Sequence, residues 1–199
     1  NGINLTNEFL QAVKNDEDWR LIDPKTKEAV KIVSARDLWW QILNARAETG
    51  EPYMINIDNC NDAMPKQQKE LGLEIKQSNL CSEITLPTNE ERTAVCCLSS
   101  VNLEHFDEWS KDKNFIEDLV TMLDNVLQHF IDNAIDISEI GEYNANYKRF
   151  AKHVKEDKKS FTKAAYSAYR ERSIGLGAMG FHAYLQRKGI PFEGIFATG

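Results

Sequence analysis

The spacing of apolar and polar residues divides the 199-residue chain into segments with helical periodicity and segments with strand-like alternation. Near the start, Thr6 is a typical N-cap residue, and Phe9, Leu10 and Val13 follow it on one helical face. The sequence DPKTKEAVKIV indicates a turn at Pro24 and then a short extended piece. This part of the chain therefore predicts a helix, a turn and a strand-like segment.

A longer helix is predicted for the sequence SARDLWWQILNARAETG. Ser34 and Asp37 form a capping-box-like start, in which Asp replaces the usual Glu. Gly50 stands where a helix commonly ends in a left-handed glycine, and Pro52 follows just beyond it. The apolar stripe of this helix consists of Leu38, Trp39, Ile42 and Ala45.

The middle of the chain alternates between the two kinds of pattern. YMINID has the period of a strand, CNDAMPKQQKELGLEIK is polar and broken and predicts a loop, and both QSNLCSEITLPT and TAVCCLSSVNL are strand-like. FIEDLVTMLDNVLQHFIDNAID predicts a long amphipathic helix. Its expected apolar positions are Phe115, Leu119, Met122, Val126, Phe130 and Ile131.

Towards the end, KEDKKSFTKAAYSAYRERS is charged and then helical, and IGLGAMGFHAYLQRKG predicts a strand end, a glycine turn and a helix. Strand-like and helical segments thus alternate along the chain, which favours the α/β fold class. Neither end of the sequence has the character of a domain boundary. We therefore expect residues 1–199 to be a piece of a larger domain, truncated at both ends.

The composition is that of a globular protein, with 42% hydrophobic and 28% charged residues. The formal net charge of −7 argues against direct binding to nucleic acid or to a membrane surface. No apolar run approaches the ~20 residues of a membrane-spanning helix, and the first residues lack the pattern of a signal peptide. The four cysteines are too few for the disulfide framework of a small secreted fold, so a reducing, cytoplasmic location is expected.

Reactive groups gather in QSNLCSEITLPT, where Asn79, Cys81 and Glu83 occupy alternate positions. In an extended segment these three side chains share one face, and Leu80, Ile84 and Leu86 lie on the other. One interpretation is a half-buried strand whose polar face meets water. The other is a site at which a thiol, a carboxylate and an amide act on one substrate; cysteine is an unusual choice for a wet face, which favours this second interpretation slightly.

Cys96 and Cys97 follow within another strand-like segment, and a hairpin-like return would bring one of them beside Cys81. A cluster of thiols with a carboxylate suits a metal site, a redox pair or radical chemistry. The metal site is the weakest of the three, because there is no Cys-x-x-Cys pair and adjacent cysteines on a strand face opposite ways. The four histidines are scattered singly, so no metal is expected.

The sequences SNLCSEI and AVCCLSSVNL closely resemble the active-site region of the large (α) subunit of class I ribonucleotide reductase. ARDLWWQILNARAETGEPYMINIDNCN and RSIGLGAMGFHAYL resemble the same family in the same order. Leu80 and Ser82 favour class I, because the adenosylcobalamin-dependent class usually carries Asn-Pro-Cys-Gly-Glu at these positions. The resemblance covers essentially the whole chain.

The resemblance implies a role for each group. Cys81 matches the cysteine that becomes a thiyl radical and removes the 3′ hydrogen of the substrate ribose. Glu83 matches the general base for the 3′ hydroxyl. Asn79 matches the amide that holds the substrate hydroxyls and helps to tune Glu83, and Ser78 belongs with these two among the expected substrate-binding residues.

Cys96 matches one half of the redox pair that supplies the reducing electrons. The family motif is Cys-x-Leu-Ser, which selects Cys96 over Cys97. The other half of the pair lies far upstream in the family and has no counterpart in these residues. Cys60, in DNCN, matches a family position without a catalytic role, and we expect it to serve packing.

The family fold is a ten-stranded α/β barrel made of two parallel five-stranded halves, with the radical cysteine at the tip of an interior finger loop. The chain is then expected to supply the central part of this barrel, with residues 77–84 as the loop. The family also implies a ribonucleotide substrate, a separate metal-containing β subunit that supplies the radical, electrons from thioredoxin or glutaredoxin, and a homodimeric complete enzyme. A chain of this extent would need the remaining α-subunit segments, or a split partner chain, to be active.

GLGAMG, from Gly175 to Gly180, is a literal G-x-G-x-x-G and suggests an alternative, a nucleotide-binding module. Its context is poor, because the preceding YRERSI is charged and only Glu193 follows near the expected acidic position. The plainer interpretation is a tight turn between a strand and a helix. A non-catalytic fragment is the third alternative.

Overall fold

The computed structural model describes residues 2–141, 145–194 and 197 of the chain. They divide into two compact units, residues 1–89 and 90–199, and each is described by itself. The first unit carries the Asn79-Cys81-Glu83 motif, and the second carries Cys96.

The first unit begins with a parallel strand pair. β1 (Gly2–Leu5) lies beside β4 (Tyr53–Asn56), with Gly2 opposite Tyr53. Between them in the sequence, α1 (Asn7–Asn15) starts where the sequence predicted, because the Thr6 side chain accepts a hydrogen bond from the Phe9 backbone N–H at 3.1 Å. The predicted strand at YMINID is also confirmed, although it ends at Asn56.

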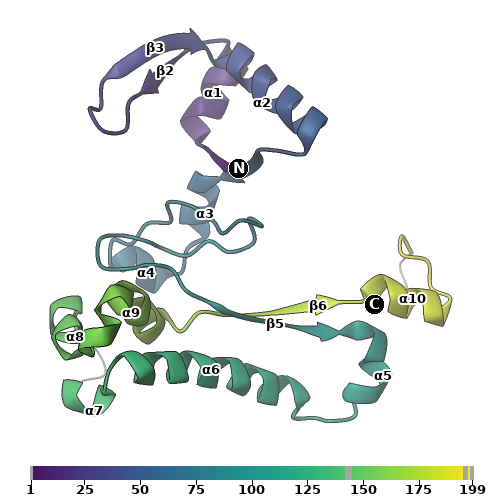
Figure 1. The fold of residues 1–199 in the computed structure, drawn as a ribbon. Helices are drawn as coiled ribbons and strands as arrows, with labels where there is room; N and C mark the ends of the chain where they lie inside the picture. The colour runs from purple at the N-terminus through teal and green to yellow at the C-terminus, as the bar shows by residue number, and fades with distance from the viewer. Residues whose placement is uncertain (1, 142–144, 195–196, 198–199) are drawn as a thin grey trace. The chain divides into compact units, whose positions relative to one another are not determined.

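An antiparallel hairpin and a long helix complete this part (Figure 1). β2 (Asp18–Ile22), which the sequence pattern did not indicate, pairs with β3 (Ala29–Ser34). Asp23 closes the predicted turn by accepting hydrogen bonds from the next backbone N–H groups. α2 (Ala35–Thr49) is capped by Ser34 at its start and by Gly50, at φ 78°, at its end, as predicted.

The helices α1 and α2 bury one small core together with the hairpin. Phe9 is its centre, because its ring makes edge-on contacts with Trp19 at 5.2 Å and Trp39 at 6.4 Å between centroids. The buried members of this core are Leu5, Phe9, Ala12 and Ala35. Packing therefore ties the hairpin to the helices that precede and follow it in the chain.

Two short helices occupy a stretch for which the sequence predicted a loop. α3 (Ile57–Ala63) follows β4 directly, and α4 (Lys66–Glu70) comes after Pro65. The prediction was wrong here because an amphipathic pattern needs several turns to be recognised, and these helices have only seven and five residues. Ile57 and Met64 bury against Ile75 of the following loop, a contact that sequence periodicity does not reveal.

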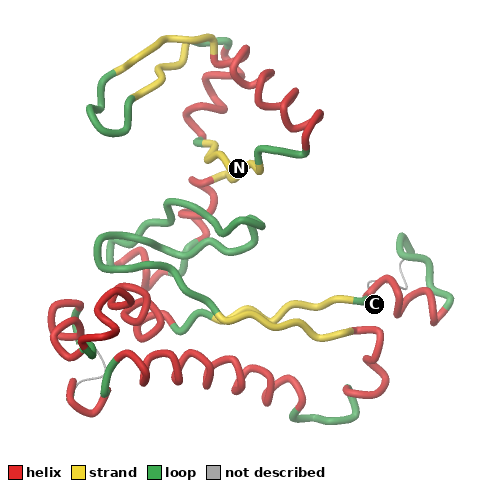
Figure 2. Tube along the Cα trace, in the orientation of Figure 1, coloured by secondary structure: helices red, strands yellow, loops and turns green. Residues whose placement is uncertain are grey.

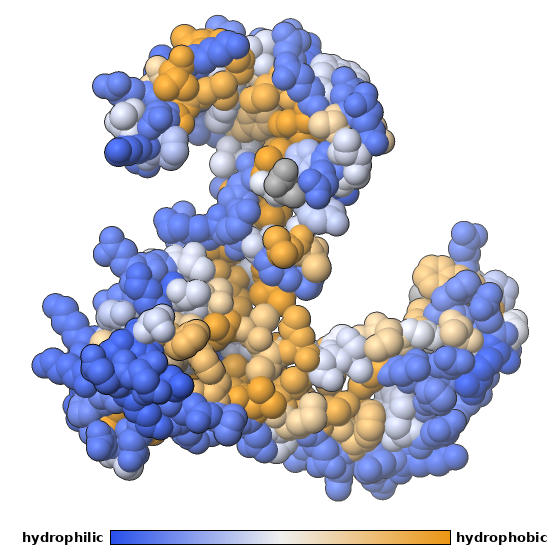
Figure 3. Space-filling view, in the orientation of Figure 1, coloured by the Kyte–Doolittle hydropathy of each residue, from blue (hydrophilic) through white to orange (hydrophobic). Residues whose placement is uncertain are grey.

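The second unit is built on a parallel pair and a long helix. β5 (Cys97–Asn102) lies beside β6 (Ile174–Met179), with Cys97 opposite Ile174, and α6 (Phe115–Ala134) covers one face of the pair. Apolar side chains gather between β5–β6 and α6 in the space-filling view (Figure 3). The predicted strands and the predicted long helix are thus confirmed.

The predicted apolar face of α6 was wrong at two of its six positions, and three others, Phe115, Leu119 and Phe130, are half-buried. Met122 and Val126 are 46% and 49% exposed, whereas Leu123 and Leu127 are 3% and 2% exposed. The helix carries apolar residues over about half of its circumference, and periodicity does not say which edge of so wide a stripe is buried. Of the six positions predicted, Ile131 is fully buried.

Shorter helices surround this framework. η1 (Leu103–His105) and α5 (Phe106–Trp109) follow β5, and α10 (Phe181–Lys188) follows β6. The hydroxyl of Tyr184 on α10 donates to Asp107 on α5 at 3.1 Å, which joins the two helices that follow the strand pair at the same end.

The remaining helices are α7 (Ile137–Ile140), α8 (Tyr147–His153), η2 (Glu156–Phe161) and α9 (Thr162–Glu171). They pack with the end of α6 around Phe150, which is fully buried and touches the rings of Tyr166 and Tyr169. A side chain of this size, fully buried, contributes about 1.5–3 kcal/mol to stability. The principal core of the second unit therefore lies where α6, α8 and α9 meet.

The α/β class is confirmed, and the described strands form two parallel pairs and one antiparallel hairpin. Parallel strands are joined by crossover connections that usually contain helices, so two parallel pairs with helices between their strands are consistent with a segment of a parallel barrel. Within the described ranges, no helix is both long and apolar enough to cross a membrane.

Candidate active site

The chain from residue 71 to 96 contains no helix or strand, and the segment 77–88 within it is called the finger loop below (Figure 2). The expected strand at 77–88 does not form in these residues, all of which are described. Instead the loop turns back on itself: the Ser82 N–H donates to the Asn79 carbonyl at 3.2 Å, and Ser82 adopts a φ of 69°. The strand prediction assumed an extended backbone with side chains on alternate faces. A turn bends the backbone here, so that assumption does not hold.

Asn79 holds the turn closed with both its backbone and its side chain. Its backbone N–H donates to the Ile84 carbonyl, and its Oδ1 accepts from the Ile84 N–H, each at 3.1 Å. The Ser78 hydroxyl also donates to the Asn79 carbonyl, at 2.9 Å. An amide that pairs with backbone groups in this way stabilises turns for which no strand partner is present.

The same amide also orients a carboxylate. Asn79 Nδ2 donates to Glu83 Oε1 at 2.6 Å, a charge-assisted hydrogen bond. Cys81 lies between these two residues in the sequence, is exposed, and sits at the turn beside Leu80, whose side chain is 91% exposed. The structure thus brings Asn79 and Glu83 into contact and presents the Cys81 thiol at the tip between them.

The approach to the finger loop is held by two asparagines that the sequence pattern did not single out. Asn61 on α3 accepts from the Ile75 N–H at 2.8 Å and donates to the Ile75 carbonyl at 3.0 Å, so its side chain replaces a strand partner. Asn4 on β1 donates to the Lys76 carbonyl at 2.8 Å. In the sequence, Asn61 is visible only as a polar residue one position after Cys60 in DNCN. Its position alone did not show whether its side chain bonds to the backbone of another segment or faces solvent.

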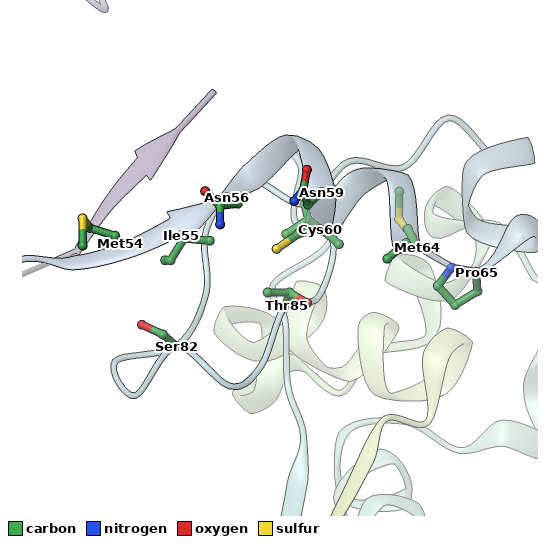
Figure 4. Close-up of a pocket in the computed structure, with 11 residues that line it drawn as sticks. Met54, Ile55, Asn56, Asn59, Cys60, Met64, Pro65, Ser82 and Thr85 are labelled. Atoms are coloured by element: carbon green, nitrogen blue, oxygen red, sulfur yellow. The ribbon is translucent and has the colours of Figure 1, made fainter. Parts of the chain in front are cut away.

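A hollow of about 480 Å³ lies between the finger loop and the β4–α3 connection. Figure 4 shows Ser82 and Thr85 of the loop facing Ile55 and Cys60 across it. Cys60 is half-buried and packs against the small core of Ile57, Met64 and Ile75, in agreement with the packing role expected for it. The hollow keeps one side of the loop open within the first unit.

Cys96 and Cys97 stand at the start of β5 in the second unit. Cys97 packs against the principal core, beside α6 and α9. Successive residues of an extended chain point to opposite faces, so Cys96 is directed away from this core. All four cysteines lie in the described residues, and none is in a disulfide.

The glycines of GLGAMG do not form a dinucleotide-binding turn. Gly175 and Gly177 lie inside β6, and only Gly180, at φ 75°, begins a helix. A Cβ atom at Gly175 would meet the end of the exposed Leu98 side chain at 2.5 Å, so a larger residue there would require Leu98 to move. The plainer interpretation, a tight turn between a strand and a helix, was wrong for Gly175 and Gly177 and holds for Gly180 alone.

Among the described residues, no group of three or more histidine, cysteine, aspartate or glutamate side chains is arranged to hold a metal ion.

Comparison with protein families decides what this loop belongs to. The model of the ribonucleotide reductase barrel domain matches residues 1–198. The chain belongs to this family. The resemblance expected from SNLCSEI and AVCCLSSVNL is confirmed, and the chain is similar to a segment of class I α subunits.

Individual relatives agree with the family model. The ribonucleoside-diphosphate reductase large subunit of Invertebrate iridescent virus 3 is 47% identical over 177 residues, which cover 89% of the chain and 24% of the relative. A putative large subunit of Frog virus 3 is 46% identical over 192 residues, covering 96% of the chain and 30% of the relative. The chain therefore spans less than a third of the length of these reductase subunits.

A solved structure extends the similarity to the fold. The α subunit of the class Id ribonucleotide reductase of Actinobacillus ureae has a TM-score of 0.71 and 33% sequence identity, covering 98% of the chain and 31% of that structure. The strand pairs and helices described above therefore correspond to one contiguous segment of a reductase α subunit.

Proposed function

We propose that the chain is the central segment of the catalytic barrel of a class I ribonucleoside-diphosphate reductase α subunit, and that it supplies the residues that attack the ribose. The observation that carries this proposal is the finger-loop turn, in which Asn79 donates to Glu83 at 2.6 Å with Cys81 at the tip. The family membership and the presence of all three residues in one turn support it.

Cys81 acts as the hydrogen-abstracting group. As a thiyl radical it takes the hydrogen atom from C3′ of the ribose, so that the C3′–H bond breaks and an S–H bond forms. The two bonds are similar in strength, and the step is therefore reversible. An exposed thiol at the tip of a narrow turn can approach a sugar without interference from its own backbone.

Glu83 acts as general base and accepts the proton of the 3′ hydroxyl while the 2′ hydroxyl leaves as water. A general base has to lie within hydrogen-bond reach of the proton it removes, and its orientation has to be fixed beforehand. Asn79 provides that orientation through its hydrogen bond to Glu83 Oε1. Ser78 and Asn79 are the polar groups at the base of the turn that would bind the substrate hydroxyls.

Cys96 provides one of the two thiols that reduce C2′. Two thiol hydrogens and the ribonucleotide yield a deoxyribonucleotide, one water molecule and one disulfide, so atoms and electrons balance. The packing of Cys97 into the core supports the assignment of Cys96 rather than its neighbour. The second thiol belongs to a part of the α subunit outside these residues, and thioredoxin or glutaredoxin would reduce the disulfide.

The wider assembly follows from the family. The segment would contribute β1, β4, β5 and β6 to a ten-stranded barrel of the homodimeric enzyme, with the finger loop inside it. A metal-containing β subunit would supply the radical, and a cytoplasmic location suits the reduced thiols. The parallel pairing of both strand pairs supports the barrel.

Substitution of Cys81 by serine tests the proposal in the complete α subunit that carries this segment. Serine keeps the size of the side chain but has an O–H bond too strong for reversible hydrogen transfer, so deoxyribonucleotide formation should fall to the background rate. The matched control is Cys60→Ser, which removes a thiol of the same unit that lines the hollow. It should keep most of the activity, and reductase activity in the Cys81→Ser enzyme would disprove the radical role.

A further inference from the structure

A charged pair is buried in the second unit, four residues before Cys96 in the sequence. Arg92 Nε lies 3.1 Å from Glu171 Oε1, and the two side chains are only 8% and 5% exposed. The guanidinium group also lies over the ring of Tyr166, 5.1 Å from its centroid. Charged side chains are seldom buried to this extent, because the loss of hydration costs several kcal/mol for each ion.

The pair is in contact but poorly hydrogen-bonded. Arg92 Nε and both carboxylate oxygens of Glu171 are buried, and no well-formed hydrogen bond satisfies them, although Nε and Oε1 are 3.1 Å apart. The hydroxyl of Ser167, one turn before Glu171 on α9, is also buried without a partner. Burial raises the pKa of Glu171 above its ordinary value, and the charge of Arg92 opposes this shift only in part. Such a pair contributes little to stability, so its presence calls for another explanation.

The pair lies under the segment that leads to the active-site cysteine. Residues 92–97, called the strap below, run beside α9 and are tied to it at both ends. The Thr93 N–H donates to the carbonyl of Lys163 at the start of α9, at 3.4 Å, and the Cys97 N–H donates to the carbonyl of Ser173 just beyond its end, at 3.3 Å. Both backbone bonds are long, and Cys96 lies between them.

Arg92 and Glu171 are the side-chain contact that reinforces this arrangement. Lys163, Ser167 and Glu171 follow one another at intervals of four residues and so share one side of α9. The backbone of the strap is bonded near the two ends of α9, and the Arg92 side chain contacts Glu171 near the second of them. An ion pair fixes the position of one segment on another, because its two charged groups must stay close together. An apolar contact of the same size allows the two segments to shift along each other.

We propose that Arg92 and Glu171 form a positioning pair, which pins the strap to α9 and so sets where the Cys96 thiol stands for its reaction with the second thiol. The proposal rests on the function proposed above. In this role neither residue contacts the substrate. The role gives a reason for a buried ion pair, with its cost in lost hydration, four residues before Cys96.

The decisive variant carries Arg92→Met together with Glu171→Leu in the complete α subunit. It removes both charges at once, so that no unpaired buried charge remains, and the midpoint of unfolding should stay within a few degrees of that of the parent. We expect kcat for ribonucleotide reduction to fall about tenfold with KM unchanged, because a thiol displaced by a fraction of an ångström meets its partner less often.

A second measurement does not depend on turnover. The rate of Cys96 alkylation by N-ethylmaleimide, followed peptide by peptide with mass spectrometry, should rise at least about fivefold in the double variant, because a loosened strap opens locally more often. Alkylation of Cys81 should not change. Arg92→Lys keeps the positive charge but not the planar guanidinium, and its rate of Cys96 alkylation should lie between those of the parent and the double variant. This variant replaces the double variant in the test if the double variant does not fold.

Asp124→Asn is the matched control. It removes the ion pair that Arg172, next to Glu171, makes with α6 at 2.8 Å, and it changes no residue of the strap or of the Arg92–Glu171 pair. Alkylation of Cys96 in this variant should equal that of the parent. An equal rise in the control, or parental kcat and parental Cys96 alkylation in the double variant and in Arg92→Lys, would overturn the proposal. Failure of the Cys81→Ser test would instead overturn the proposed function, and the alkylation rates would still report on the strap.

Discussion

Asn79 carries more of the site geometry than either reactive residue beside it. Its backbone and side chain take part in five hydrogen bonds of the turn, of which two are with Ile84 and one is with Glu83. The amide has both an acceptor and a donor, and each is used for a different purpose. Oδ1 fixes the backbone of the turn, and Nδ2 fixes the direction of the Glu83 carboxylate.

Two substitutions of Asn79 separate these purposes. Asn79→Ala removes both, and we expect kcat to fall by about 10²-fold or more, in the range found when a catalytic base loses its alignment. Asn79→Asp keeps the acceptor for the Ile84 N–H but places a second carboxylate against Glu83, whose repulsion turns Glu83 away. Steady-state kinetics of the complete enzyme measure both.

The result that would contradict this account is an Asn79→Asp enzyme as active as the parent. It would show that the hydrogen bond from Nδ2 to Glu83 is not needed. An Asn79→Ala enzyme with unchanged kcat would show in addition that the turn holds without the amide.

At the scale of elements, the junction of β6 and α10 depends on one glycine. Gly180 has a φ of 75° and lies against Asn102, whose Oδ1 accepts from the Glu104 N–H at 3.0 Å. A Cβ atom at Gly180 would collide with that Oδ1 and approach the backbone nitrogen of Glu104 at 3.2 Å. The turn after β6 therefore packs directly against the turn after β5, with no room for a side chain at Gly180.

We expect Gly180→Ala to lower the free energy of unfolding by about 2–3 kcal/mol, of which about 1 kcal/mol is the strain of the left-handed backbone. Gly189→Ala is the control, because Gly189 has a φ of 66° but nothing within 4 Å of the added Cβ. It should cost about 1 kcal/mol. Denaturant unfolding followed by circular dichroism measures both, and equal losses would show that the contact with Asn102 is unimportant.

Elements with a cap were predicted well, and those defined by contacts were not. Thr6 and Ser34 mark the starts of α1 and α2, and Gly50 marks the end of α2. Each acts within a few residues of its helix end, so the sequence shows it directly. β2 has no such signal, and its strand exists because β3 pairs with it. α6 shows the same limit, since its buried edge is chosen by α9 and β5 rather than by its own pattern.

For the molecule as a whole, the chain holds part of the proposed machinery. Cys81, Glu83 and Cys96 are present, but the second reducing thiol has no counterpart in the family position expected upstream. The matched relatives extend well beyond the chain, which covers 24% and 30% of the first two. A radical at Cys81 would also need the walls of a closed barrel to protect it from solvent.

We therefore expect the 199-residue chain, mixed with a radical-generating β subunit, substrate and thioredoxin, to form no deoxyribonucleotide above background. The control is the complete α subunit under the same conditions, which should turn over. The assay is the quantification of deoxyribonucleotide product by chromatography. Product formation by the chain alone would mean that a complete barrel is not required.

The sequence by itself determined the family and the capped helices, because these depend on side-chain chemistry and short-range spacing. Asn79, Cys81 and Glu83 were recognisable in SNLCSEI, although their shared strand face was the wrong geometry. Tertiary structure decided that Asn79 and Glu83 meet in a turn whose approach is held by Asn61, and that Arg92 lies buried on Glu171. Contacts between residues far apart in the chain depend on how the whole core closes, and no local pattern encodes that closure.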